Sequence, residues 1–155
     1  MADRSSFLRS LTILHTALLA GQLLLAAMAY ALWHFEIMNA PSSALDQALQ
    51  VAAILISGTA FFLGARLFRR RVEQARDHGS TVAEKAAAYR SASILQWSLL
   101  EGASLFSIIS FLLVGNLSFL FLAFALMFFF FLNRPSKIKL LVLLRLTDAE
   151  IEGLS

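Results

Sequence analysis

Four long apolar runs separated by polar stretches dominate the pattern along the chain. They cover about 11–33, 48–68, 91–114 and 117–132. A helix needs about 17–25 mostly apolar residues to cross the ~30 Å hydrocarbon layer of a bilayer, and each run is near that length. The pattern therefore predicts an all-α fold: a bundle of four transmembrane helices in one integral membrane domain spanning residues 1–155.

The connecting segments predict how these helices are joined. Residues 115–118 leave room only for a tight antiparallel hairpin between the third and fourth runs. The loop 69–90 is rich in alanine, glutamate and arginine, which favours extension of the second and third helices beyond the bilayer. The expected turn between them lies near His78–Ser80.

The tail 136–155 is expected to lie at the cytoplasmic interface. Its first part, 136–146, is too short to span again and combines lysines with leucines, which predicts a short amphipathic segment. Thr147 and Glu150 have the spacing of a capping box that opens one last helix. An anchoring or packing role for this tail is favoured over a partner-binding role.

Composition agrees with lipid as the solvent. Of the 155 residues, 59% are hydrophobic and 15% are charged, whereas roughly 25% are charged in an average soluble domain. A soluble protein of this size could not bury so much apolar surface. There is no cysteine, which excludes disulfides, thiolate metal sites and thiol catalysis.

The basic residues predict the orientation. All 13 lie before the first run, in or beside the loop 69–90, or after the fourth run. The positive-inside rule then places both termini and that loop in the cytoplasm. Contact with anionic lipid explains the basic surface groups without nucleic acid; these groups are Arg69, Arg70, Arg71, Arg134, Lys137 and Lys139.

The first run is expected to remain in the mature protein. Ala27–Ala29 has the small residues of a cleavage site. However, the apolar stretch before it is longer than the roughly 7–15 residues of a signal peptide.

One ionisable carboxyl group, that of Glu101, lies within the predicted spans. It is ten residues beyond Ser91, which corresponds to about 15 Å of helix and hence to the middle of the bilayer. A charged group is costly there, so Glu101 is expected to hold a proton and to be a functional candidate. Polar residues expected at similar depth or on the same helix face complete the candidate ion site: Gln22, Ser57, Thr59 and Ser98.

Small residues predict close approach of the helices. Ala17 with Gly21, Ala60 with Gly64 and Ser98 with Gly102 have the small-xxx-small spacing, and Gly58 lies at the centre of the second run. The third helix is therefore expected to pack into protein along its Ser98, Glu101 and Gly102 side. The fourth run holds seven of the 14 phenylalanines, which favours a lipid-facing or oligomer-contact helix.

The stretch from Glu84 to Phe106 contains Leu-Leu-Glu101-Gly102-Ala. It resembles the ion-binding helix of the proteolipid c subunit of rotary ATP synthases. The resemblance implies that Glu101 takes the place of the ion-binding carboxylate, in a hairpin with its loop inside the cell. The chain differs from that family in its two additional spans. As a whole it resembles small four-helix membrane proteins of bacteria, and this resemblance implies the inner membrane of a bacterium as its location.

Two functions remain open from the sequence. The favoured one is a structural or accessory subunit of a larger membrane complex or homo-oligomer, with Glu101 as a hydrogen-bonding group between helices. The alternative is a proton- or cation-handling protein that uses Glu101 as the reversible site. No catalytic constellation, metal-ligand spacing or cofactor motif is present, so enzyme activity is not expected.

Overall fold

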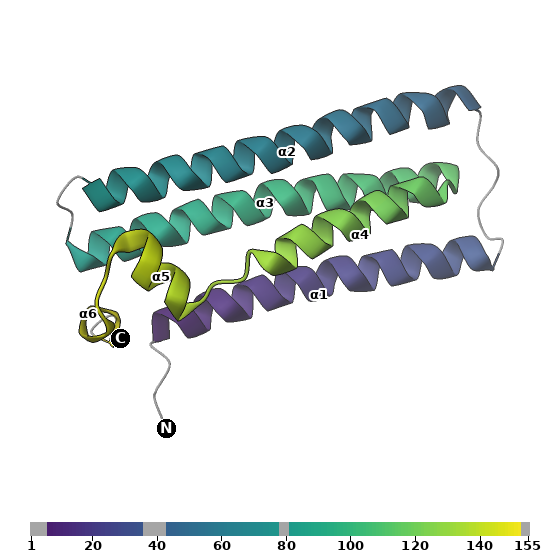
Figure 1. The fold of residues 1–155 in the computed structure, drawn as a ribbon. Coiled ribbons are helices and arrows are strands. Elements are labelled where there is room, and N and C mark those ends of the chain that lie inside the picture. Colours follow the sequence, from purple (N-terminus) through teal and green to yellow (C-terminus); the bar gives the residue numbers. More distant parts are fainter. Residues whose placement is uncertain (1–5, 36–42, 78–80, 153–155) are drawn as a thin grey trace.

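The computed structural model describes residues 6–35, 43–77 and 81–152, in which every regular element is an α-helix. The helices, drawn in Figure 1, are α1 (Ser6–His34), α2 (Ser43–Asp77), α3 (Val82–Val114), α4 (Leu117–Leu132), α5 (Lys137–Leu144) and α6 (Asp148–Glu152). The all-α prediction is confirmed.

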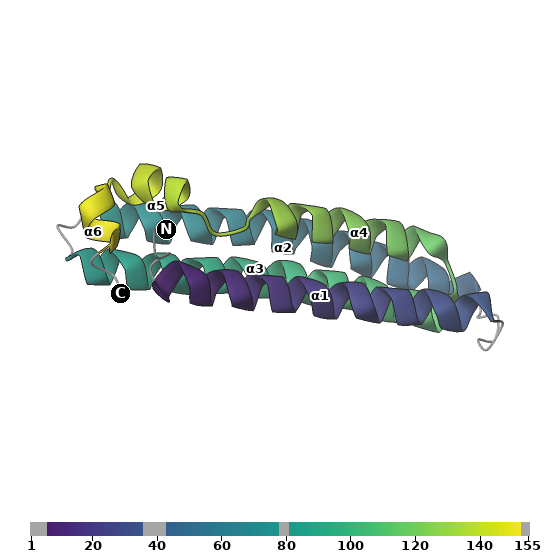
Figure 2. The same ribbon diagram turned by 90° about the horizontal axis from the view of Figure 1, so that it is seen from below.

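The four long helices form an elongated bundle in which α3 is central. Helix α3 packs along α2 most extensively, and it also contacts α4 and α1. Figures 1 and 2 show α1 to α4 side by side, with α5 and α6 at the end where α2 finishes and α1 and α3 begin. Helix α5 contacts α2 there. The C-terminal tail therefore covers one end of the bundle.

Three helices, α1, α2 and α3, are each long and apolar enough to cross a bilayer. Helices α4 and α5 pass the same test only as a pair, and a 73° bend separates them. Helix α4 alone has 16 residues, or about 24 Å of length. Three to four such helices indicate a multi-pass membrane protein.

The predicted connections are largely confirmed. Helix α2 continues to Asp77 and α3 begins at Val82, while the predicted turn at 78–80 lies outside the described residues. Thr81 and Glu84 form a capping box that starts α3. At the other end, Gly115 adopts a left-handed conformation and the Asn116 side chain caps α4, which makes the expected tight hairpin.

The tail forms the two short helices that were predicted, α5 and α6. Glu150 accepts hydrogen bonds from the Thr147 backbone N–H and hydroxyl, both at 2.7 Å, and the box opens α6. In α5, Leu140 and Leu144 are fully buried against the bundle. Ile138 and Val142 on the same helix are 71% and 68% exposed. Helix α5 thus exposes large apolar side chains as well as burying them, so the predicted amphipathic pattern of residues 136–146 is wrong.

The fourth run was expected to face lipid or another subunit, and this is wrong for one side of α4. Phe119 and Phe130 are buried, together with Ala123. Phe121 and Phe128 are exposed. Because one side of α4 packs on α3 and α1, only the opposite side is free for lipid or another subunit.

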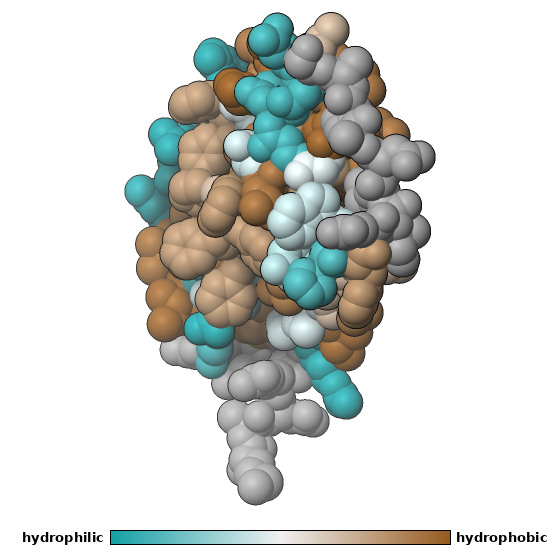
Figure 3. All heavy atoms as spheres, turned by 90° about the vertical axis from the view of Figure 1, so that its right-hand side faces the viewer, coloured by the Kyte–Doolittle hydropathy of each residue, from teal (hydrophilic) through white to brown (hydrophobic). Residues whose placement is uncertain are grey.

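The two ends of the bundle differ in their charged residues. The described Lys and Arg side chains belong to the end that contains α5 and α6, or to the helix termini that reach it. The opposite end carries His34, Asp46 and Asn116, and the Asn116 amide donates to the Asp46 carboxylate at 3.0 and 3.1 Å. Figure 3 views that end and shows hydrophobic side chains interspersed with hydrophilic ones.

Candidate functional site

Glu101 lies near the middle of α3, on the side that faces away from the bundle core. Its own side chain is partly exposed, and Ser98 and Gly102 beside it are exposed. The buried side of this part of α3 carries Trp97 and Leu100 instead. Within the single chain, the predicted packing of the Glu101 side into protein is therefore wrong.

The glycines predicted to mediate helix packing behave differently from one another. A Cβ atom placed on Gly64 would lie 3.5 Å from Gln96 Cγ and 3.7 Å from Leu99 Cδ1, so α2 and α3 approach closely there. The same test at Gly21, Gly58 and Gly102 finds nothing within 4 Å. Gly64 alone of these four serves the predicted purpose inside the described chain.

The structure divides the predicted ion site into two groups. Gln22 and Ser57 are buried, at 1% and 5% exposure, in the interior of the bundle. Thr59 and Ser98 are exposed, as are parts of Glu101. Within the described residues, no hydrogen bond joins Glu101 to another side chain. The predicted contact between Glu101 and the interior polar groups is therefore not formed here.

The antiparallel register of α2 and α3 places Thr59 at the level of Glu101. Gly64 packs against Gln96, and Thr59 and Glu101 each lie five residues further toward the opposite end. Since antiparallel helices advance past each other by equal steps, these two residues share one level. Glu101 with its exposed neighbours Ser98 and Gly102 on α3 forms an outward-facing surface, which we call the Glu101 face, and Thr59 of α2 is exposed at the same level.

A second polar group lies inside the bundle at the level of Gln22. The rings of His15 and Trp97 are 4.9 Å apart, and α1 and α3 run in the same direction (Figure 1). Seven residues further along each helix come Gln22 and Ser104, which therefore lie at one level. The Gln22 amide atoms and the Ser104 hydroxyl are buried and have no hydrogen-bond partner among the described residues.

The end of α4 is held by side chains from three other helices. His15 Nε2 lies 2.9 Å from the Phe130 carbonyl oxygen, and Trp97 Nε1 donates to the Asn133 carbonyl at 3.2 Å. Lys139 Nζ donates to the carbonyls of Leu132 and Arg134 at 3.1 and 3.0 Å. These bonds satisfy carbonyl groups that a helix end otherwise leaves unpaired.

His15 is a buried side chain whose ring is hydrogen-bonded. It is 3% exposed and stacks on Phe130 with ring centroids 4.5 Å apart. Because a carbonyl can only accept, Nε2 carries the ring proton in this bond. Over the described part of the chain, no three histidine, cysteine or acidic side chains are grouped to hold a metal ion.

Comparisons with protein-family models, with curated proteins and with solved structures found no match. Function is therefore inferred from this chain's own residues.

The sequence contains only part of the signal for the α4 terminus. Pro135 lies two residues after Asn133, and a proline there marks a helix end. The side chains that bind the carbonyl groups of the α4 terminus could not be predicted from local sequence, because His15 is 115 residues from Phe130 in the chain. Lys139 was predicted as a membrane-surface residue, and its role in the helix cap comes only from the structure.

Proposed function

We propose that this chain is a structural or accessory subunit of a membrane complex, and that the Glu101 face binds another protein chain within the bilayer. In this proposal the protein crosses the inner membrane four times. Helix α4 makes the fourth span, and α5 lies along the cytoplasmic interface. Both termini and the loop 69–90 lie in the cytoplasm.

The distribution of charge supports this placement. The basic side chains gather at the end of the bundle that carries α5 and α6, and basic residues are retained on the cytoplasmic side of membranes. The bend after α4 is compatible with a membrane location because His15, Trp97 and Lys139 satisfy its carbonyl groups. Irregular backbone is tolerated at membrane depth when protein groups satisfy it in this way.

The observation that carries the proposal is the outward position of Glu101 in the middle of an apolar helix. A carboxyl group facing hydrocarbon is unfavourable by several kcal/mol when ionised, and intramembrane acidic groups normally face protein or water. No described side chain of this molecule hydrogen-bonds to it. A hydrogen bond from a neighbouring chain would remove that cost.

The residues around Glu101 suit such a contact. Ser98 and Gly102 are exposed on either side of it, and a Cβ on Gly102 would meet nothing within 4 Å. Small residues on a membrane helix let a second helix approach closely enough for van der Waals packing and interhelical hydrogen bonds. The Glu101 face therefore combines a polar group with the space that a partner helix needs.

The alternative, a reversible proton or cation site at Glu101, is less well supported by the geometry. An ion path through this molecule would need polar groups that continue from Glu101. The buried polar residues Gln22 and Ser104 instead lie on the inward side of the helices, and no hydrogen bond in the described part of the chain connects them to Glu101. The accessory function needs no such path.

Glu101→Gln and Glu101→Leu are expected to separate the two functions. Glutamine keeps the hydrogen-bonding group without its ionisation, so the partner should remain bound. Leucine removes the hydrogen-bonding group. The affinity for the partner should then fall by about 5- to 30-fold, as expected for loss of an interhelical hydrogen bond of ~1–2 kcal/mol. Native mass spectrometry of the full chain purified in mild detergent would measure the bound fraction.

Thr16→Val is the matched control, since Thr16 is an exposed polar residue of α1 whose hydroxyl bonds only within its own helix. It should retain the partner. Equal loss with glutamine and leucine would contradict the hydrogen-bonding role and favour an ionisable one.

A further inference from the structure

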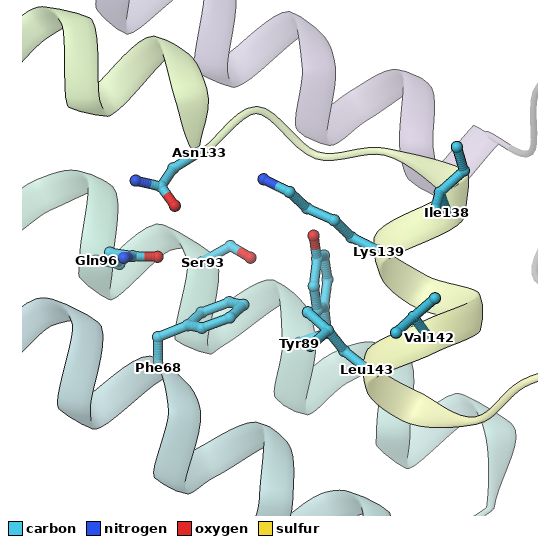
Figure 4. A pocket seen from close by; sticks show the side chains of 9 residues that line it. All are labelled: Phe68, Tyr89, Ser93, Gln96, Asn133, Ile138, Lys139, Val142 and Leu143. Carbon is cyan, nitrogen blue, oxygen red and sulfur yellow. The ribbon is translucent and has the colours of Figure 1, made fainter.

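A cavity of about 320 Å³ lies between α5 and the α2–α3 hairpin, next to the break that follows α4. It is separate from the Glu101 face. Figure 4 shows its side chains, which come from α2, α3, α5 and the α4–α5 connection. The residues that line it are Phe68, Tyr89, Ser93, Gln96, Asn133, Ile138, Lys139, Val142 and Leu143.

The polar groups of the cavity converge on one region and are rich in hydrogen-bond donors. In Figure 4 the Lys139 ammonium, the Tyr89 hydroxyl and the Ser93 hydroxyl point toward the same space, with the amides of Gln96 and Asn133 beside them. Tyr89 and Ser93 are each 2% exposed, so these are buried polar groups and not surface side chains. Among the described residues that line the cavity, none is acidic.

Lys139 has donor capacity left for a ligand. Its ammonium group has three protons, and two of them bind the carbonyl oxygens of Leu132 and Arg134. Asn133 likewise uses one amide proton on the Phe129 carbonyl at 2.8 Å. Burial and the charge of Arg134 lower the pKa of Lys139 from its usual value, and a bound anion would offset both effects.

The remaining wall is apolar and reaches the outer surface of the molecule. Phe68 and Leu143 are partly buried, and Ile138 and Val142 are mostly exposed at the rim. A cavity of about 320 Å³ is at the small end of the 300–1,000 Å³ typical of ligand pockets. It has room for a headgroup and a few methylene groups, so longer chains would extend outward over Ile138 and Val142.

We propose that this cavity binds the phosphate group of an anionic phospholipid from the adjacent leaflet. The phosphate oxygens accept from Lys139, from the amides opposite it and from one hydroxyl of the Tyr89–Ser93 pair, which are hydrogen-bonded to each other, and the acyl chains leave along the exposed apolar rim of α5. Basic pockets between membrane helices on the cytoplasmic side suit anionic headgroups. The site does not depend on what the Glu101 face binds, and it can be tested in the isolated chain.

The test is a titration of the delipidated full chain in mild detergent, followed by native mass spectrometry. Phosphatidylglycerol is expected to bind more tightly than phosphatidylcholine, because no acidic residue balances the choline cation. Lys139→Gln should weaken phosphatidylglycerol binding by about tenfold or more, the range for a lost hydrogen bond to a charged group. Lys137→Gln, an equal change of charge on the same helix outside the cavity, should change binding by less than about twofold.

Tyr89→Phe gives a second test that leaves the α4 cap untouched. It removes one hydroxyl from the opposite wall of the cavity and should weaken binding by about threefold to tenfold. Equal losses in Lys137→Gln and Lys139→Gln, or no loss in Lys139→Gln and Tyr89→Phe, would overturn the proposal. Displacement of the lipid by equimolar inorganic phosphate would also overturn it, because the site would then recognise soluble phosphate without the apolar rim.

Discussion

Replacing Trp97 with alanine is expected to lower the free energy of unfolding by about 3–5 kcal/mol, the usual range for loss of a large buried aromatic side chain. Trp97 is 1% exposed and packs edge-on against His15. It also donates from Nε1 to the Asn133 carbonyl at 3.2 Å. The substitution would therefore leave a cavity where α1, α3 and α4 meet and would free a carbonyl at the end of α4.

Trp97→Phe separates these two contributions. Phenylalanine retains most of the ring but lacks the N–H group, so the expected loss is about 1–3 kcal/mol for an unsatisfied buried carbonyl, plus part of the packing. Reversible unfolding in mixed micelles, followed by circular dichroism, would measure both variants. A loss below about 1 kcal/mol for Trp97→Ala would contradict the packing of Trp97 at the centre of the bundle.

Gly115→Val is expected to destabilise the protein by about 2–5 kcal/mol, through two effects that add. Gly115 has a φ of 66°, a left-handed conformation that is unfavourable for a β-branched residue. A Cβ atom there would also lie 3.3 Å from Trp33 Cδ1 and Nε1. The tight turn between α3 and α4 would have to distort, and Trp33 would have to move.

Gly115→Asn and Gly58→Val are the controls, measured by the same unfolding experiment. Asparagine adopts left-handed conformations more readily than other residues with a side chain, so it should cost less than valine at position 115. Gly58 has no atom within 4 Å of an added Cβ, and valine has a somewhat higher helix propensity than glycine, so valine there should not destabilise the protein. If valine were equally harmless at both positions, the left-handed cap would be the wrong account of Gly115.

The helices could be predicted from the sequence because each apolar run is long and the polar breaks between them are clear. The capping box at Thr147 was also predicted, since it depends on neighbours within three residues. The box at Thr81 has the same local signal but was not predicted. The level of Glu101 along α3 followed from counting residues. Each of these properties depends on residues that are close together in the sequence, so it can be predicted without knowing the tertiary packing.

The rotation of each helix about its own axis could not be predicted. In a membrane protein the lipid-facing and core-facing sides are both apolar, so the pattern that marks the inner side of a soluble helix is weak. On α3, for example, Leu100 is buried and Ile109 is 50% exposed. Small residues were expected to mark the packed side, but Ser98 and Gly102 lie outside it. Packing that depends on all four helices decides this rotation.

The most direct test of the account is photo-cross-linking from the Glu101 face in native membranes. A photoreactive amino acid would replace Leu105, one turn from Glu101, or Val51, a 60% exposed residue of α2. A discrete protein adduct is predicted from position 105 and not from position 51. It should weaken when Glu101→Leu is added and persist when Thr16→Val is added. Adducts with lipid alone at both positions would contradict the claim that the Glu101 face binds another protein chain.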